Sequence, residues 1–346
     1  DRGLFSLRFS PTLPPSAMDL WSRLTPLTLA HAAEVAHRKF PPPLSWTAGD
    51  LHRALEAIDQ KQAMRETPMS RLQQWSTASR HVLLPEKTIL FYPELPAPYH
   101  KATTFCALCG FKMIQDPRRD YDAALQFQTR TVTPRAQLRE ALDPSTTING
   151  HCLDISKQTV AHTFEKVFGY PLQIDPTTYS GQGVKKSNAN GTHDGAVISC
   201  PIPKEEMEDG MVYQRLIETQ TDEKYYVNHR VAVCDGLVPT VLVMYRPPDD
   251  PFDETSHQET VPLIDAFSPD ERIKLRKFVR VMQLDYGELD VLRDKTTGKI
   301  YVVDANTTPT TSQVGEDDNQ MADYKKRWRR SVADGFRRMI LDHSDA

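Results

Sequence analysis

Two β-rich runs near the C-terminal end of the sequence carry a set of carboxylate and amide side chains. The runs are residues 288–293 (ELDVLR) and 300–306 (IYVVDAN), and residues 294–299 between them are typical of a turn. This pattern predicts an antiparallel β-hairpin. Because side chains alternate between the two faces of a strand, a hairpin centred on Thr297 projects four polar side chains from one face: Glu288, Asp290, Asp304 and Asn306.

The same register places Asp290 opposite Asp304, at the open end of the hairpin. Carboxylates that face each other directly repel unless a cation lies nearby. Carboxylate and amide oxygens suit Mg²⁺, which is usually completed by substrate phosphates and water. The alternative is an exposed hairpin whose polar rim is neutralised by a nearby Lys or Arg, and this feature alone does not decide between the two. On the other face, four side chains are expected to pack into a core: Leu289, Val291, Tyr301 and Val303.

The order of these residues resembles the metal-binding end of ATP-grasp enzymes, a family that includes carboxylate–amine ligases. Asp290 is followed by Asp304-x-Asn306 and then by Pro309. The resemblance implies that Asp290, Asp304 and Asn306 hold one or two Mg²⁺ ions, with Mn²⁺ as an alternative, which bridge the phosphates of ATP.

The resemblance extends back along the chain to two lysines. Lys157, which opens a predicted helix, matches the first lysine that contacts ATP in this family. Lys186 matches the second, on the first strand of the nucleotide-clasping lobe. Lys185 and Lys186 are neighbours, and adjacent strand residues face opposite sides. Which of them points inward stays open, although the place of Lys186 before the following loop favours it.

Two further segments match ATP-contacting parts of the family. Residues 191–195 (GTHDG) occupy the place of the small-residue loop over the phosphates, and residues 214–217 (QRLI) match the hinge whose backbone recognises adenine. By itself, His193 is more often a loop histidine than an acid or base. The resemblance implies nine nucleotide-contacting residues: Lys157, Lys186, Gly191, His193, Gly195, Gln214, Arg215, Leu216 and Ile217.

Two arginines, Arg230 and Arg246, resemble those that face phosphate and substrate in this family, and they are the implied catalytic residues. Arg230 lies inside an otherwise apolar strand, so its charge needs a partner there. A ligand or a neighbouring carboxylate could supply that partner, and the sequence favours neither.

The resemblance also implies a reaction. A substrate carboxylate attacks the γ-phosphate of ATP to give an acylphosphate and ADP, and an amine or similar nucleophile then displaces phosphate. The partners implied are small-molecule or peptide carboxylates and amines. Two alternatives stay open: a kinase or phosphotransferase acting on a hydroxyl, and a non-catalytic nucleotide-binding module.

The elements that must position these residues are predicted to be mixed α+β and α/β. Strand and helix signals over 88–132 favour a small parallel unit, with a hairpin over 183–200 and a helix over 269–282 further on. The resemblance implies an ATP-grasp fold, in which two α+β lobes clasp ATP. The predicted division is 1–17, disordered or extraneous to the protein; 18–85, a helical N-terminal appendage; 86–150, a small α/β pre-ATP domain; and 151–340, the ATP-grasp domain, with a nucleotide-clasping lobe over 181–245 and a metal-binding lobe over 246–340.

Composition limits the partners and the setting. With 42 Lys and Arg against 46 Asp and Glu, the chain has no basic excess to neutralise phosphates, so we expect no nucleic-acid partner. No apolar run is long enough for a membrane helix.

Five cysteines, an odd number, are typical of reduced thiols and predict a cytoplasmic protein. The lone CxxC, Cys106 and Cys109, is expected to be structural rather than a zinc or redox site. The sequence does not indicate an oligomeric state.

Overall fold

The computed structural model describes residues 86–136, 141–192, 194–221, 225–247, 257–310 and 319–344. The expected segments 1–17 and 18–85 lie outside these residues. The described chain divides into two compact units. The first comprises residues 86–88 and 96–114, and the second comprises the remainder.

The first unit contains α5 (Lys101–Cys109) and β2 (Lys112–Ile114). The helix ends at Gly110, whose φ of 72° is the left-handed conformation that favours glycine. Both thiols of the CxxC lie buried on α5, and burial raises the pKa of Cys106 well above its ordinary value. None of the five cysteines, all of which fall within the described residues, forms a disulfide.

A small sheet contains three strands that run parallel to one another: β1 (Thr88–Pro93), β3 (Ala123–Phe127) and β4 (Thr147–Ile148). All five residues of β3 are buried, as expected of a parallel strand covered on both faces. The predicted parallel unit is therefore confirmed. The strand expected to continue to residue 132 ends at Phe127, and Val132 makes only an isolated bridge.

A second, antiparallel sheet has the order β6 (Ala196–Cys200), β5 (Gly181–Ser187) and β7 (Met211–Arg215). It confirms the hairpin predicted over this part of the sequence. The 3₁₀ helix η2 (Lys204–Glu206) lies between β6 and β7 in the chain. The last strand, β7, ends at Arg215, two residues before the end of the β-rich stretch 212–217.

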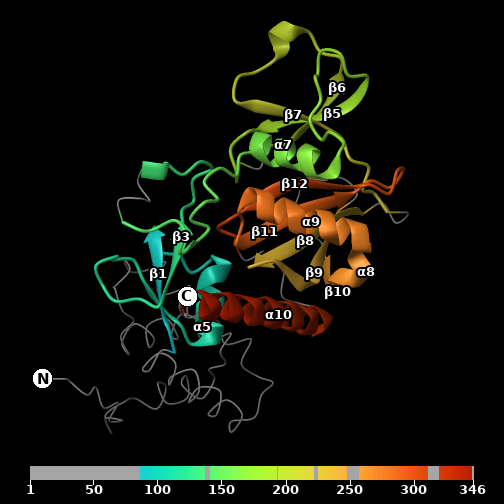
Figure 1. The fold of residues 1–346 in the computed structure, drawn as a ribbon. Helices are drawn as coiled ribbons and strands as arrows, with labels where there is room; N and C mark the ends of the chain where they lie inside the picture. Colours follow the sequence, from blue (N-terminus) through green and yellow to red (C-terminus); the bar gives the residue numbers. More distant parts are fainter. Residues whose placement is uncertain are drawn as a thin grey trace, which may run out of the picture. The chain divides into compact units, whose positions relative to one another are not determined.

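The largest sheet has five strands, and every neighbouring pair is antiparallel. Figure 1 shows α9 on one side of this sheet and α10 on the other. The mixture of parallel and antiparallel sheets with helices confirms the predicted α/β and α+β class. In sheet order the strands are β10 (His257–Pro262), β9 (Leu237–Arg246), β8 (Tyr226–Cys234), β11 (Tyr286–Arg293) and β12 (Ile300–Asn306).

Helices cover this sheet for reasons that are visible in the sequence. The helix predicted over 269–282 is confirmed as α9, and its start has a capping box in which Ser268 and Glu271 each accept a backbone N–H of the other. The basic residues 325–330 lie on α10. No helix within the described residues is long and apolar enough to cross a membrane. The helices are α7 (Lys157–Phe168), α8 (Leu263–Ala266), α9 (Pro269–Met282) and α10 (Asn319–Ser344).

The two faces of the sheet have different environments. On one face, Val231 and Leu289 are fully buried in a core to which α7, α8 and α9 contribute. On the opposite face, Tyr286 meets Phe336 of α10 with ring centroids 5.4 Å apart. Strand alternation puts Glu288 and Asp290 on the same side as Tyr286, beyond the end that α10 covers.

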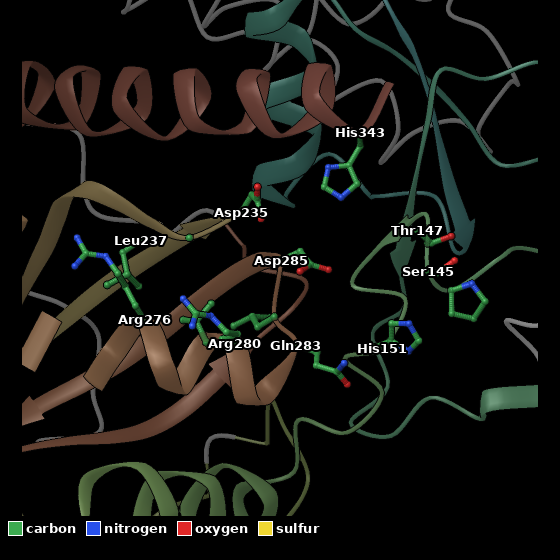
Figure 2. A pocket seen from close by; sticks show the side chains of 14 residues that line it. Ser145, Thr147, His151, Asp235, Leu237, Arg276, Arg280, Gln283, Asp285 and His343 are labelled. Carbon is green, nitrogen blue, oxygen red and sulfur yellow. The ribbon is translucent and has the colours of Figure 1, made fainter. Parts of the chain in front are cut away.

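Asn149 holds the start of β11. Its Oδ1 accepts the backbone N–H groups of Asp285 (2.8 Å) and Tyr286 (2.9 Å), and its Nδ2 donates to the Tyr286 carbonyl at 2.7 Å. Next to this clamp, the β8–β9 turn and the C-terminal ends of α9 and α10 line a cavity, which Figure 2 shows from close by.

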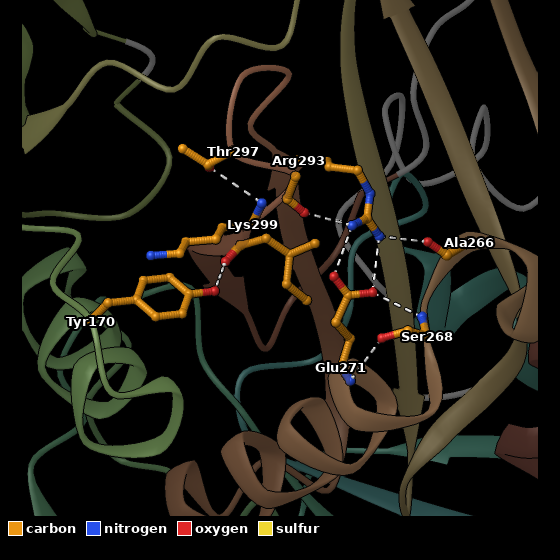
Figure 3. Close-up of polar contacts among 9 residues, drawn as sticks. Tyr170, Ala266, Ser268, Glu271, Arg293, Thr297 and Lys299 are labelled. Carbon is orange, nitrogen blue, oxygen red and sulfur yellow. Dashed lines mark hydrogen bonds and ion pairs between the residues drawn. The ribbon is translucent and has the colours of Figure 1, made fainter.

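The tip of the β11–β12 hairpin is tied to two helical regions, as Figure 3 shows. Arg293 forms a two-pronged ion pair with Glu271 at the start of α9, with nitrogen–oxygen distances of 2.8 and 3.1 Å. The hydroxyl of Tyr170, just after α7, donates to the Ile300 carbonyl at 2.6 Å. These contacts fix the hairpin that carries the acidic side chains at its other end.

Candidate functional site

The open end of the β11–β12 hairpin has the predicted pairing. Asp290 lies opposite Asp304, and Glu288 lies opposite Asn306. Two carboxylates therefore face each other across adjacent strands, and a third acid is two residues along the same face.

The half of the hairpin nearer the turn departs from the predicted register. Between Asp290 and Val291 the pairing shifts, so that Val291 lies opposite Val302 and Val303 is left out of the ladder. A hairpin centred on Thr297 is therefore wrong beyond this point, and Val303 is only partly buried rather than a full core residue. Such a bulge bends the strand and re-aims the side chains beside it, and bulges are common next to functional sites.

Arg230, on β8, neutralises the acids of β11. Its Nε lies 3.0 Å and its Nη2 3.3 Å from the two carboxylate oxygens of Asp290, and its Nε is 3.6 Å from Glu288. Burial alone would raise the pKa of Asp290, but the charge and hydrogen bonds of Arg230 outweigh it and hold that pKa below its ordinary value. The partner that the buried arginine was expected to need is thus a neighbouring carboxylate.

Asp304 is left without such a partner. Its Oδ1 is buried and accepts no hydrogen bond from the part of the chain that the structure describes. Burial and the negative charge of Asp290 raise the pKa of Asp304 to about 6, against the opposing charges of Lys157 and Lys186. A buried acceptor in this state fits a proton or a bound cation.

The two neighbouring lysines of β5 point in opposite directions. The Lys186 ammonium donates to the Val303 carbonyl at 3.3 Å, and burial lowers its pKa to about 8 despite the charge of Asp304. Lys185 instead pairs with Glu208 at 2.6 Å, on an exposed side. The structure therefore places Lys186 beside the acidic pair and Lys185 away from it.

Lys157 lies in the first turn of α7, where the hydroxyl of Ser156 caps the helix by accepting from Thr159 N. The Lys157 side chain is buried, and its ammonium donates to the carbonyl of Ala189 at 2.5 Å. This contact brings a positive charge toward Asp304 and anchors the loop that follows β5.

The rest of that loop is described in part. Gly191 has a φ of 74°, which a side chain would strain, and Gly195 directly precedes β6. His193, the third residue predicted in this loop, lies outside the described residues.

The segment 214–217, expected to be a hinge, is largely occupied by internal contacts. Gln214 pairs with strand residues on both sides, and the Leu216 N–H donates to the Gln182 carbonyl at 3.2 Å. Arg215 donates to the Tyr301 hydroxyl at 3.0 Å, and Ile217 is part of the apolar core. The Gln214 amide nitrogen is buried and finds no hydrogen-bond acceptor among the described residues.

Asn306 and Arg246 lie at the margin of the acidic site. The Asn306 Oδ1 accepts the backbone N–H of Thr308 at 2.8 Å, so this oxygen is directed toward the loop after β12. Arg246, the last residue of β9, contributes to the low pKa of Asp290, which places its charge near the acidic pair.

The donor set fits Mg²⁺ through Asp304, whose unpaired oxygen is a hard ligand of the type that this ion prefers. Asp290 and Asn306 would have to exchange their present partners, Arg230 and Thr308, for the ion. As the side chains stand, no three His, Cys, Asp or Glu within the described residues form a metal-binding group.

Two residues of this face have contacts that the sequence did not predict. Glu288, which the sequence places on this face without a role, is buried and lies 3.6 Å from Arg230. Asn228 was not predicted at all, and its hydrogen bond helps to lower the pKa of Asp290. It could have been found by counting two residues along the strand from Arg230.

Comparisons with solved structures return ATP-grasp proteins, at low sequence identity. A RimK-domain ATP-grasp protein from Sphaerobacter thermophilus is 12% identical, with 73% of this chain and 99% of that chain covered at a TM-score of 0.43. D-alanine–D-alanine ligase from Bacillus anthracis is 13% identical, with 75% and 97% covered at a TM-score of 0.43. The macrocyclase MdnC from Microcystis aeruginosa, bound with the precursor peptide MdnA, is 12% identical, with 74% and 98% covered at a TM-score of 0.41.

No protein-family model matches the sequence, and no curated protein matches it significantly. The residue roles proposed below therefore rest on the motif resemblance and on the geometry of the described residues.

Proposed function

We propose that this protein is a Mg-ATP-dependent ligase that activates a carboxylate as an acylphosphate for attack by an amine, with release of ADP and phosphate. The observation that carries the proposal is the unpaired, buried oxygen of Asp304, which lies opposite Asp290 and within the field of two buried lysines. Three carboxylates and several cations on one face form a site suited to a ligand that brings both a metal ion and phosphates.

In this proposal the chain contributes positioning and charge. Lys157 and Lys186 approach Asp304 from α7 and from β5 and would bind phosphate oxygens with charge-assisted hydrogen bonds. Mg²⁺ held by Asp304, Asp290 and Asn306 would neutralise charge on the phosphates. Arg230 and Arg246 would then face the transferred phosphoryl group and the substrate.

The proposal assigns nucleotide binding to the loop after β5 and to the segment 214–217. Gly191 and Gly195 would let the loop backbone approach the phosphates closely, with His193 between them. Adenine would lie against the segment made by Gln214, Arg215, Leu216 and Ile217. The buried amide nitrogen of Gln214 is a donor that a bound ligand could satisfy.

The reaction products test the proposal. Purified protein is incubated with Mg-ATP and a panel of amino acids, small peptides and other carboxylates with amine acceptors, and ADP, phosphate and new amides are measured. The ligase proposal expects ADP and phosphate in equal amounts, dependent on both substrates. ADP without phosphate would identify a kinase acting on a hydroxyl, and binding without turnover would identify a nucleotide-binding module.

A matched pair of variants ties the activity to the site. Asp304→Asn keeps the size of the side chain and removes its charge, so we expect turnover to fall about a hundredfold or more. Lys185→Ala, on the exposed side of β5, should leave turnover close to that of the parent. Full activity of Asp304→Asn would show that the reaction takes place elsewhere.

A further inference from the structure

The cavity next to the Asn149 clamp has a volume of about 660 Å³ and lies at the opposite end of β11 from the hairpin turn. Its volume is within the range of about 300–1,000 Å³ that is typical of small-molecule sites. Asp285, in its wall, precedes Asp290 by five residues, which correspond to about 17 Å along an extended strand. The cavity is therefore separate from the acidic site of the hairpin.

One wall of the cavity is basic. Arg276 and Arg280 are one helical turn apart on α9, so they share a face of the helix. Neither guanidinium has an ion pair or hydrogen bond with any residue that the structure describes. The two arginines can bind a carboxylate. His151 and His343 also line the cavity, on the side of Asp285 away from the arginines, as Figure 2 shows.

The remaining wall is acidic. One carboxylate oxygen of Asp285, Oδ2, accepts the backbone N–H of Asn149 at 2.7 Å. The other accepts no hydrogen bond within the described ranges, although the charges of His343 and His151 act on this carboxylate and oppose the rise in its pKa. Asp235, in the β8–β9 turn, adds a second carboxylate to the lining. Burial raises the pKa of Asp285, and the nearby charge of Asp235 adds to this effect. A cationic group bound here would stabilise the ionised carboxylate.

The backbone around the cavity is held in an uncommon conformation. Asn149, Asp235 and Gln283 have φ values of 60°, 50° and 54°, and they are the non-glycine residues with positive φ within the described chain. Asp235 and Gln283 line the cavity, and Asn149 fixes Asp285. Residues in such conformations persist only where the surrounding structure determines them, and they gather at ligand sites.

We propose that this cavity binds a zwitterion, namely a free amino acid or a short peptide. Its carboxylate pairs with Arg276 and Arg280, and its ammonium pairs with Asp285. An anion with no positive charge would face the carboxylates of Asp285 and Asp235 unpaired, and a simple cation would face the two arginines. Only a ligand that carries both charges satisfies both walls. This inference does not depend on the proposed ATP reaction.

Calorimetric titration of the full chain tests the charge requirement. The probes are the twenty free L-amino acids and triglycine, which separate a free amino acid from a peptide as the source of the zwitterion. The best binder is then compared with its N-acetylated form and its carboxamide form, each of which lacks one charge. Each blocked form should bind about ten- to a hundredfold more weakly. The absence of binding by every probe, or equal binding of the blocked forms, would overturn the proposal.

Variants tie that binding to the cavity. Arg276→Gln, Arg280→Gln and Asp285→Asn should each weaken binding by the same order. Arg276 and Arg280 are exposed, so their substitution should not disturb the fold. Lys277→Gln, which removes a neighbouring exposed charge outside the cavity, should have no effect. Unchanged binding in the Arg276, Arg280 and Asp285 variants, or an equal loss in the Lys277 variant, would contradict the proposal. Asp304→Asn should bind the zwitterion normally even if Mg-ATP binding is lost, which separates this site from the proposed function.

Discussion

Strands β8 and β11 lie side by side, and their two faces have opposite chemistry. On one face, Val231 and Leu289 are fully buried among apolar side chains. On the other, one residue earlier in β8 and one residue later in β11, Arg230 and Asp290 form a two-pronged ion pair. The apolar face holds the sheet to its helices, whereas the polar face holds charges that are satisfied only in part. The apolar face therefore builds the fold, and the polar face is where we propose that a ligand binds.

Loss of the arginine should produce the largest effect on the polar face. Arg230→Met leaves Asp290 and Glu288 without their cation, so the free energy of unfolding should fall by about 3–5 kcal/mol. Urea denaturation at pH 8 measures it. In the double variant with Asp290→Asn the loss should be smaller, because one unpaired charge is gone. A loss of less than about 1 kcal/mol would mean that the pair behaves like an exposed one.

Truncation of a core residue is the matching change on the apolar face. Leu289→Ala should lower the free energy of unfolding by about 2–5 kcal/mol, because it removes buried methyl groups and leaves a cavity. The loss should be the same at low and high salt, since no charge is involved. A loss that changes with salt would show that the two faces are coupled rather than independent.

A histidine on the apolar face predicts a pH dependence. Burial, and then the charge of Arg293, lower the pKa of His229 from 6.5 to about 4. The folded protein therefore binds fewer protons than the unfolded chain between these values. The stability from neutral His229 is complete above pH 6.5 and is lost as the pH falls through about 4. The shift corresponds to about 3 kcal/mol.

His229→Gln, which does not titrate, isolates this contribution. The difference in unfolding free energy between parent and variant should shrink as the pH is lowered from 7.5 to 4, measured by urea denaturation. A difference that stays constant over this range would show that His229 is not responsible.

The sequence predicted the parts of the site that depend on strand alternation. The pairing of Asp290 with Asp304 follows from the spacing of two β-rich runs, and it is confirmed at the open end of the hairpin. The bulge at Val303 was not predicted, because apolar residues at positions 300–303 carry no signal for an extra residue. Near the turn, the strands pair one residue away from the predicted register. The extra residue of the bulge cancels this difference, so the pairing of the acids is as predicted.

Contacts between distant segments could not be read from the sequence. The partner of Arg230 depends on β8 lying next to β11, although many residues separate them in the chain. The direction of the Lys186 side chain depends on how β5 meets β12. Strand alternation predicts only that Lys185 and Lys186 face opposite sides, and not which of them points inward. The hydrogen bond from the Thr308 N–H to the Asn306 Oδ1 joins residues only two positions apart. The family resemblance implies a metal ligand at Asn306, and this local bond was not predicted.

The binding of Mg-ATP to the two neighbouring lysine variants tests the central claim most directly. Lys186 lies beside Asp304, and Lys185 pairs with Glu208 on the exposed side, so the two changes remove the same charge from opposite faces of β5. In calorimetric titrations, Lys186→Ala should bind Mg-ATP about ten- to a hundredfold more weakly than the parent, through loss of a charge-assisted hydrogen bond. Lys185→Ala should bind like the parent. Parent-like binding by Lys186→Ala, or a loss confined to Lys185→Ala, would contradict a nucleotide site on the polar face.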